Sequence, residues 1–435
     1  MLKNYDIAIL GAGPAGIMAG LSARKIDKNA KICIVDSNNN IASKLRLTGG
    51  GRCNFTNNKD ISVFFDNVVR NSKFLYSALY SFSNEDLKTF IKASGLEYIV
   101  EDDNDDKVYL KSGKSMDLIE VLNLQLRNSG IDFIGKTKIK ELDLKSRKIF
   151  SDDLIIEANT IIIASGACSY PQTGSDGSIM KLLSNKGYNI IKPVSALAPM
   201  DIKESWVKDI PGISLQNIQI KVLKLGVKNK SGVKSNSQNV KHKKVAELFG
   251  DIVFTHKGIG GPAALKASSY INRDISGSSL ELDFIPYINR EALLDMVKSN
   301  PKKTIPSNLK ELFPNNFLKR ILEKCNDESE GQFDFLNDYS ANLSNKNFEI
   351  LYESLKGAKI TPTALADLER ATITSGGIDV KNINSSTLES NIDPNIYFAG
   401  ELIDIDALTG GYNLQIAFST GYLAGVSAAE NLKNS

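Results

Sequence analysis

The stretch from Asp6 to Gly16 reads DIAILGAGPAG and decides the fold of this chain. Its first half, Asp6 to Leu10, has the apolar pattern of a buried strand, and a helix is predicted over Ile17 to Arg24. A second strand is predicted over Lys31 to Asp36. Because Gly-x-Gly-x-x-Gly lies here between a strand and a helix, it indicates a dinucleotide-binding βαβ unit. The crossover helix requires the two strands to be parallel.

Each glycine of this turn has a separate predicted role. Gly11 permits the tight turn, Gly13 lets the backbone approach a pyrophosphate, and Gly16 lets the helix and strand pack closely. The helix N-terminus adds free N–H groups and a partial positive charge. At the end of the second strand, Asp36 can accept hydrogen bonds from an unphosphorylated ribose, as in the AMP half of FAD or NAD. The alternative is a Gly-rich structural turn that binds no ligand.

The far end of the chain favours FAD over NAD. Tyr397 to Glu401 ends a strand-like run, and Leu408 to Leu414 is a second Gly-rich turn before a helix predicted over Tyr412 to Leu432. The N–H groups of this turn would face the flavin, where negative charge builds on reduction. Either Glu401 or Asp404 would bond the ribityl hydroxyls. The sequence shows no second Gly-x-Gly-x-x-Gly unit, so we expect NAD(P)H to visit the flavin only transiently as electron donor.

The composition is that of an ordinary globular protein. Of the 435 residues, 42% are apolar and 24% are charged, with a formal net charge of +3, which excludes collagen-like, coiled-coil and largely disordered chains. No apolar run reaches the length of a membrane span. The N-terminus lacks the features of a signal peptide, so we expect a cytoplasmic protein. The 4 cysteines are widely spaced and the histidines number 2, which argues against a disulfide framework or a metal site.

The chain is predicted to be an α/β protein with a split Rossmann-like domain. Thr160 to Gly166 is a short apolar run typical of a strand buried on both faces, and Ile396 to Gly400 repeats it. We therefore expect residues 1–192 and 379–435 to form the FAD-binding domain. Residues 193–286 and 345–378 are predicted to form a β-rich insertion, and residues 287–344 a helical subdomain.

The stretch from Lys44 to Asn57, KLRLTGGGRCNFTN, is the least ordinary of the sequence. Its three consecutive glycines cost backbone entropy, which indicates that another backbone or a ring approaches here. Arg52 is a candidate to pair with a pyrophosphate or a substrate anion, and Cys53 is a candidate acid near the flavin. The alternative for Cys53 is a small buried hydrophobe. His256, in a further Gly-rich segment, is either a proton donor, a substrate ligand or a structural hydrogen-bonding group.

The segment from Lys221 to Lys244 holds 8 lysines and no acidic residue. Such a run is typical of a solvated hairpin loop. The alternative is an arm that contacts phosphates, since clustered lysines supply the salt-dependent part of nucleic-acid affinity.

These motifs, in this order, resemble those of the BaiN/YhiN-like flavoprotein family, which includes ribosomal RNA dihydrouridine synthases (RdsA) and aminoacetone oxidases. The resemblance runs nearly end to end through GAGPAG, KLRLTGGGRCNFTN, ASGACSYPQTGSDG, FTHKGIGGPAAL, TSGGID and AGELIDIDALTGGYNLQIAFSTG. It implies FAD on a split Rossmann-like domain, with an inserted β-barrel-like domain and a small helical subdomain. One departure lies at Lys107 to Leu110, KVYL, where family members often have R-V-F-P. It follows the acidic run Glu101 to Asp106.

Carried onto this sequence, the motifs and the resemblance assign the cofactor contacts to one set of positions. These are Gly11, Gly13, Pro14, Ala15, Gly16, Asp36, Ser37, Lys44, Gly51, Arg52, Cys53, Asn54, Ile139, Ala164, Gly166, Gly400, Glu401, Asp404, Gly410, Gly411, Tyr412, Asn413 and Leu414. Cys53 and His256 are the catalytic candidates.

The resemblance implies a flavin hydride transfer, with three possible outcomes. The first is reduction of a uridine in 23S ribosomal RNA to dihydrouridine, fed by NAD(P)H, with the lysine segment Lys221 to Lys244 as an RNA contact. The second is a small-molecule reaction, either oxidation of aminoacetone or reduction of an enone. The third is a flavin-binding protein without efficient turnover of its own.

Overall fold

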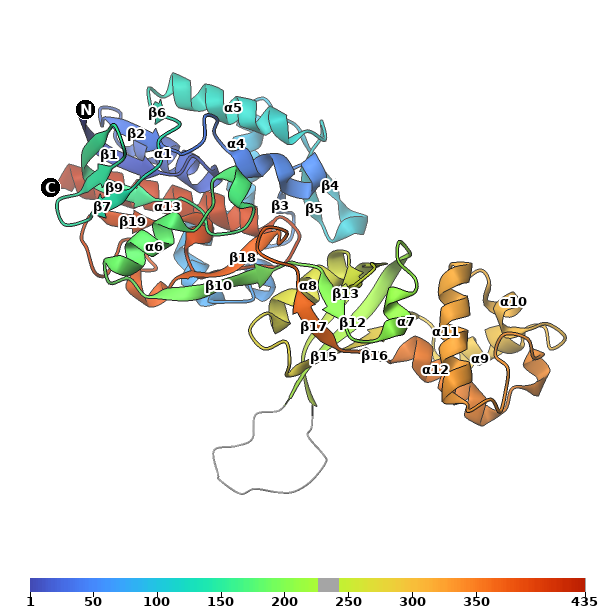
Figure 1. The fold of residues 1–435 in the computed structure, drawn as a ribbon. Coiled ribbons are helices and arrows are strands. Elements are labelled where there is room, and N and C mark those ends of the chain that lie inside the picture. The colour runs from blue at the N-terminus through green and yellow to red at the C-terminus, as the bar shows by residue number, and fades with distance from the viewer. Residues whose placement is uncertain (226–241, 435) are drawn as a thin grey trace. The chain divides into compact units, whose positions relative to one another are not determined.

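The computed structural model describes residues 1–225 and 242–434. The chain forms two compact units. Met1–Ser195 and Leu368–Ser435 make up the first, which therefore joins the two ends of the chain, and Ala196–Asp367 makes up the second. Both termini lie in the first unit, as Figure 1 shows.

The first unit is built on a mixed seven-stranded sheet. Its strands run in the order β6-β2-β1-β9-β8-β7, and β19 also pairs with β9. Their bounds are β1 (Leu2–Leu10), β2 (Ile32–Val35), β6 (Asp132–Ile134), β7 (Glu141–Asp143), β8 (Lys148–Phe150), β9 (Ile155–Ile163) and β19 (Ile396–Phe398). The pairs of β1 with β2, of β1 with β9, of β9 with β19 and of β2 with β6 are parallel, as the crossover requires. Only β7 and β8 add antiparallel pairs.

Two long helices pack together in this unit, α1 (Pro14–Ile26) and α13 (Tyr412–Asn434) (Figure 1). Helix α1 begins three residues earlier than predicted, because Pro14 at its first position has a φ already suited to a helix. The contact is close since Gly421 and Gly425 have no side chains. A Cβ built on either would lie 2.1 Å from a carbonyl oxygen of α1.

Smaller elements surround this frame. A three-stranded antiparallel sheet has the order β3 (Asn54–Asn57), β5 (Lys107–Leu110), β4 (Tyr98–Glu101), and β10 (Ile190–Ala196) pairs with β18 (Ile373–Ile378). The remaining helices are α2 (Ile61–Phe64), α3 (Tyr76–Ser81), α4 (Asn84–Ala93), α5 (Ser115–Asn128) and α6 (Ser178–Asn185).

The second unit is built on a seven-stranded antiparallel sheet. Its order is β16 (Ala358–Ile360), β15 (Ser278–Asp283), β12 (Ser214–Leu225), β13 (His242–Phe254), β14 (Gly258–Gly260), β11 (Met200–Ile202) and β17 (Pro362–Leu365). The two edge strands, β16 and β17, are joined by Thr361 alone. The sheet must therefore curl until its edges approach each other.

Helices complete the second unit. They are α7 (Ser205–Lys208), α8 (Pro262–Ile271), α9 (Arg290–Lys298), α10 (Ile305–Leu309), α11 (Asn315–Glu328) and α12 (Asn345–Lys356). Helix α12 lies beyond the helical subdomain predicted over residues 287–344. It begins here because the Ser344 hydroxyl accepts a hydrogen bond from Asn347 N and caps it.

The predicted domain boundaries also differ from those of the structure. The first unit extends to Ser195 and resumes at Leu368, whereas the sequence places these boundaries at 192 and 379. The reason is the pairing of β10 with β18, which keeps β18 and all of β10 except Ala196 in the first unit. In the part of the chain that the structure describes, no helix is long and apolar enough to cross a membrane.

Candidate functional site

Four parallel strands of the first unit end at the same edge of the sheet. Leu10 is in register with Val35 and with Ile163, and Ile163 is in register with Phe398. The next residues along the chain therefore meet at this edge: Gly11, Asp36, Ala164 and Ala399. In an open α/β sheet, ligands bind outside the carboxyl ends of the strands.

The three glycines of the first turn differ in the space around them. Gly11 has a φ of +105°, and a Cβ on it would lie 2.3 Å from the Ala164 carbonyl oxygen. A Cβ on Gly16 would lie 1.9 Å from the Gly11 carbonyl oxygen. A Cβ on Gly13 would have no atom within 4 Å. The Gly13 backbone thus borders open space where α1 begins, as a backbone that approaches a pyrophosphate requires.

Asp36 is held in place by three hydrogen bonds. Its Oδ2 accepts from Ala12 N at 2.7 Å, and its Oδ1 accepts from the backbone and side-chain nitrogens of Asn38 at 2.7 and 2.9 Å. A carboxylate has about four acceptor positions, so one remains for a ribose hydroxyl. Ser37, the next residue, is exposed.

Lys44 and Glu401 form an ion pair that the sequence did not predict. Lys44 Nζ lies 2.6 Å from Glu401 Oε2, and Glu401 Oε1 accepts from Ser169 Oγ and from Thr374 N, both at 2.8 Å. Ser169 and Thr374 were not singled out in advance, although they lie in the quoted motifs ASGACSY and TSGGID. The network joins segments that are far apart in the sequence. The Glu401 side chain remains 21% exposed.

Asp404 has a different environment from the one predicted. Arg70 donates to both of its carboxylate oxygens, at 3.1 and 2.7 Å, and Asn71 Nδ2 donates to Oδ2 at 3.1 Å. The Asp404 side chain is only 3% exposed. Glu401, whose side chain is 21% exposed, is therefore the more accessible of the two carboxylates for ribityl hydroxyls.

The triple-glycine loop borders open space. Gly49, Gly50 and Gly51 have φ values of +60°, +66° and +92°, which glycine adopts without strain. A Cβ on Gly50 or on Gly51 would have no atom within 4 Å. The loop can therefore admit another group, as the run of glycines predicts.

Arg52 contacts the segment in which this chain departs from its relatives' pattern. Its guanidinium pairs with Glu101 of the acidic run and lies 4.1 Å from the centroid of the Tyr109 ring. These residues meet because β3, which follows Arg52, pairs with β5 and β5 with β4. With its side chain 47% exposed, Arg52 remains accessible to an anion while Glu101 balances its charge.

Cys53 lies in the hydrophobic core of the first unit. It is 0% exposed and has a φ of +60°, which is uncommon for a residue other than glycine. Burial raises the pKa of its thiol to about 12. The neighbouring Asn54 is also buried, and its Nδ2 donates to the carbonyl oxygens of Thr56 and Val108. Cys53 therefore holds its proton near neutral pH.

The second Gly-rich turn packs against β3 and contains hydroxyls without partners. A Cβ on Gly411 would lie 2.3 Å from the Thr56 carbonyl oxygen. Asn413 closes the turn through hydrogen bonds with Ala407 N and O, at 3.0 and 2.8 Å. Thr409 Oγ1 and Tyr412 OH are buried and have no partner in the described part of the chain. Buried hydroxyls without partners cost free energy, so the turn fits a polar ligand.

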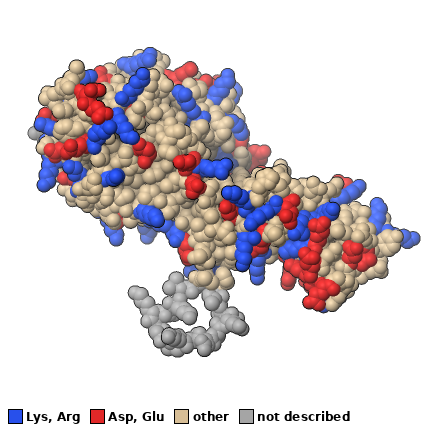
Figure 2. All heavy atoms as spheres, viewed as in Figure 1, with Lys and Arg blue, Asp and Glu red and all other residues tan. Residues whose placement is uncertain are grey.

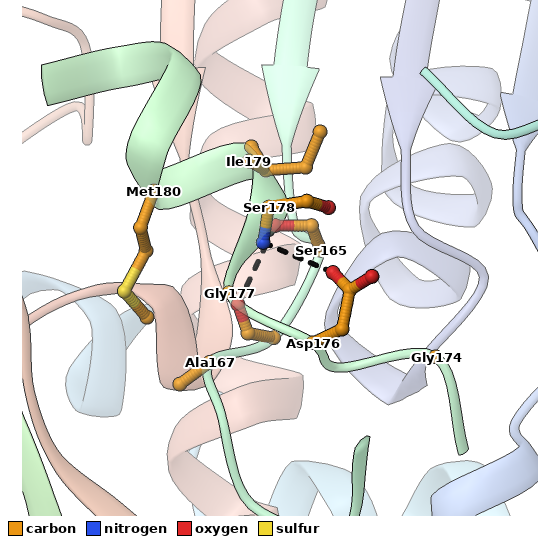
Figure 3. A pocket seen from close by; sticks show the side chains of 9 residues that line it. Ser165, Ala167, Gly174, Asp176, Gly177, Ser178, Ile179 and Met180 are labelled. Carbon is orange, nitrogen blue, oxygen red and sulfur yellow. Dashed lines mark hydrogen bonds between the residues drawn. The ribbon is translucent and has the colours of Figure 1, made fainter. Parts of the chain in front are cut away.

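A small pocket lies beyond the end of β9. Figure 3 shows that residues of the loop after β9 and residues at the start of α6 line it together. Its cavity volume is about 20 Å³, far below the range typical of cofactor pockets. Its lining consists of Ser165, Gly166, Ala167, Gly174, Asp176, Gly177, Ser178, Ile179 and Met180. Of the predicted contacts, Gly166 lines this pocket, Ala164 follows the last residue of β9, and Ile139 packs against the core.

The structure places His256 in the second unit, whereas Cys53 belongs to the first. His256 is exposed at the tip of the tight turn between β13 and β14. Thr255 N donates to Gly258 O at 2.8 Å, and Gly258 N donates back to Thr255 O at 3.3 Å. The imidazole is therefore presented to solvent by a two-residue hairpin loop.

The lysine segment lies only partly within the described residues. Lys221 pairs with Glu281 at 2.9 Å, and Lys244 pairs with Glu247. Lys224 and Lys243 face each other in the β12–β13 ladder. The other four lysines of the segment lie outside the described residues: Lys228, Lys230, Lys234 and Lys241.

The chain is similar to known proteins over nearly its whole length. A family model described as the HI0933-like protein Rossmann domain matches residues 5–427. The chain is 26% identical over 440 residues to the ribosomal RNA dihydrouridine synthase of Haemophilus influenzae, covering 98% of this chain and 99% of that protein. It is 27% identical over 437 residues to the 3-dehydro-bile acid delta(4,6)-reductase of Clostridium scindens, again covering 98% and 99%.

A solved structure supports the fold alone. FrdA of the E. coli quinol fumarate reductase matches with a TM-score of 0.50 at 14% identity, over 100% of this chain and 71% of that one. The open space at Gly13, the free acceptor position of Asp36 and the unpartnered hydroxyls at the second turn fit FAD. Because the family model matches nearly the whole length of this chain, the chain belongs to the HI0933-like family of FAD-dependent oxidoreductases.

Proposed function

We propose that this protein reduces a carbon–carbon double bond with electrons from NAD(P)H, and that its substrate is a uridine of 23S ribosomal RNA. Binding of FAD is supported by the strand ends that meet at Gly11, Asp36 and Ala164, and by the open space at Gly13. The choice of substrate is supported by relatives that match nearly end to end, two of which are named ribosomal RNA dihydrouridine synthases.

Residues of the first unit would hold FAD along this edge. The N–H groups at the start of α1 would face the pyrophosphate, and Asp36 would accept a hydrogen bond from the adenosine ribose. Glu401 would meet the ribityl chain, and the turn at Gly410 and Gly411 would support the flavin. When bound, FAD supplies hydride transfer between a nicotinamide and the substrate.

The reaction needs a proton donor as well as a hydride. Reduction of uracil adds a hydride at C6 and a proton at C5, while NAD(P)H becomes NAD(P)⁺. Cys53 is the proposed proton donor, because it lies two residues after Gly51 in the loop that borders open space. His256 is the second candidate, since it is exposed on a hairpin of the second unit. Cys53→Ala would retain FAD and lose product formation; near-full product would exclude Cys53 as the donor.

The lysine segment is the proposed contact with the RNA backbone. Lys224 and Lys243 supply two like charges side by side at the base of the hairpin, and clustered lysines make binding depend on salt. Replacing the 8 lysines between 221 and 244 by serine should weaken RNA affinity and flatten its salt dependence. Equal affinity and equal salt dependence would exclude the segment as an RNA contact.

A comparison of cells tests the substrate. Dihydrouridine in 23S ribosomal RNA would be measured by mass spectrometry in cells with the gene, without it, and with the gene restored as the Gly13→Val variant. We expect the modification to disappear on deletion and to return only with the wild-type gene. Unchanged dihydrouridine in the deletion strain would rule out this substrate.

A small-molecule enone is the second candidate substrate. The observation that favours it is the 27% identity to the bile acid reductase. Both candidates receive hydride at a double bond conjugated to a carbonyl group. Oxidation of NAD(P)H that depends on an added steroid enone, and not on RNA, would favour this alternative.

A further inference from the structure

Three aromatic side chains on the surface of the first unit play no part in the site described above. The ring centroids of Phe65 and Tyr76 lie 4.4 Å apart, and those of Tyr76 and Tyr80 lie 6.0 Å apart. All three ring planes lie within 25° of one another. Tyr76 is 52% exposed and Tyr80 is 57% exposed. Phe65, Tyr76 and Tyr80 are called the aromatic platform below.

The local helical structure turns the platform outward. The 3₁₀ turn Ser72–Leu75 continues directly into α3, which places Lys73, Tyr76 and Tyr80 on one face at spacings of three and four residues. Lys73 is exposed, and it has no ion-pair partner among the described residues. The opposite face of α3, with Ala78 and Leu79, is buried. The outer face therefore combines two parallel rings with a positive charge.

The platform is joined to the proposed flavin turn. Phe64, the residue before Phe65, packs its ring edge-on against Tyr412 of that turn, with centroids 5.0 Å apart. A little further along the chain, Val68 forms an isolated antiparallel β-bridge with Ala407. Leu408 N donates a hydrogen bond to Asn67 O at 2.8 Å. The chain that holds the platform thus runs beside the loop that leads into the turn.

We propose that the platform stacks unpaired bases of the RNA next to the uridine that is reduced. The inference rests on the proposed function. A target base must leave its stack to reach a buried cofactor, and its neighbours then lose a stacking partner. Exposed parallel aromatic rings supply such a partner for any base, because every base has a π face. Lys73 would meet a backbone phosphate.

The charge distribution favours stacking as a source of RNA affinity. On the face shown in Figure 2, Lys and Arg side chains are interspersed with Asp and Glu side chains over each unit. Asp66, the residue after Phe65, is also exposed. A mixed surface of this kind attracts the RNA backbone less than a uniformly basic one. Contacts with base faces would then carry a larger share of the binding.

The test uses the holoenzyme and a single-stranded, uridine-containing RNA oligonucleotide, with affinity measured by fluorescence anisotropy. The double variant Tyr76→Ala/Tyr80→Ala should bind about fivefold or more weakly. It should keep its FAD absorbance, and it should form less dihydrouridine in unmodified 23S ribosomal RNA. Tyr76→Phe/Tyr80→Phe keeps the rings and should bind like the wild type. Tyr287→Ala/Tyr339→Ala removes two other exposed tyrosines, 80% and 58% exposed, and should change nothing.

The outcomes separate this inference from the proposed function. If the wild type forms dihydrouridine and the alanine variant binds and reacts equally well, the platform has no role and the function stands. If the wild type forms none, the function fails and the inference fails with it. A wild-type dimer that the alanine variant abolishes would assign the platform to contacts between copies. If the alanine variant does not fold, Tyr76→Leu/Tyr80→Leu keeps apolar volume without a ring face, and it should show the same loss of affinity.

Discussion

The carboxyl edge of the parallel sheet and the β13–β14 hairpin position their functional candidates in different ways. At the sheet edge, register brings together Gly11, Asp36 and Ala164, which are far apart in the sequence. At the hairpin, His256 is placed by a turn between Thr255 and Gly258 alone. At the sheet edge, the space for an added side chain differs from one residue to the next. At the hairpin, the His256 side chain is exposed to solvent. Substitutions at the sheet edge should therefore have effects that depend sharply on position.

Gly16→Val should have the largest effect. Its Cβ would lie 1.9 Å from the Gly11 carbonyl oxygen, and that oxygen belongs to the backbone of the turn. Since α1 would have to move away from the sheet, we expect a loss of about 3 kcal/mol or more in the free energy of unfolding. Urea denaturation of the apoprotein measures it. A variant as stable as the wild type would contradict the close contact.

Gly13→Val should abolish FAD binding and leave the fold intact. A Cβ at this position meets no protein atom within 4 Å, so the apoprotein should keep its stability to within about 0.5 kcal/mol. The added methyl groups would occupy the space next to the pyrophosphate. The ratio of flavin to protein absorbance checks the first expectation, and urea denaturation checks the second. A yellow Gly13→Val protein would refute the placement of the cofactor.

Asp404→Asn should lower stability more than FAD affinity. The change leaves Arg70 beside a neutral amide in place of a carboxylate that is 3% exposed. Because Arg70 itself is 31% exposed, the expected loss is about 1–2 kcal/mol rather than that of a fully buried pair. Glu401→Gln is the matched variant, and it should weaken FAD binding instead. The reverse pattern would assign the ribityl contact to Asp404.

The last effect is confined to alkaline pH and comes from the titration of Cys53. Burial raises the pKa of this thiol from 9.0 to about 12, so the folded state keeps a proton that the unfolded state loses. Its contribution to stability is complete below pH 9.0 and is lost as the pH rises through about 12. Cys53→Ala should therefore reduce the fall of unfolding free energy between these pH values by up to about 1.4 kcal/mol per pH unit.

Cys325→Ala is the control for this titration in the second unit. The pKa of Cys325 is also raised to about 12, mainly by burial, so its removal should reduce the alkaline slope in the same way. If Cys53→Ala leaves the slope unchanged while Cys325→Ala reduces it, Cys53 is accessible to solvent and is not a core residue.

Local patterns were sufficient to predict the elements of the first turn. The apolar run that ends at Leu10 and the glycines of the turn predicted β1, the following helix and a parallel sheet, and the structure has all three. The start of the helix at Pro14 was missed, because the glycine spacing alone gives no helix boundary.

Long-range pairings could not be predicted from one sequence. Arg70 and Asp404 are 334 residues apart, and Lys44 and Glu401 are 357 residues apart. Neither pair has a local pattern, so the sequence could not tell which carboxylate would be buried. The domain boundaries were displaced for the same reason, since β10 and β18 pair across the inserted unit.

The central claim is that this FAD-dependent protein reduces uridine in ribosomal RNA. The most direct measurement incubates the purified holoenzyme with unmodified 23S ribosomal RNA and either NADPH or NADH, and determines dihydrouridine by mass spectrometry. The account predicts dihydrouridine that requires both FAD and a reduced nicotinamide and that is absent with Gly13→Val. Oxidation of NAD(P)H without any dihydrouridine, from a protein that carries its full content of FAD, would contradict it.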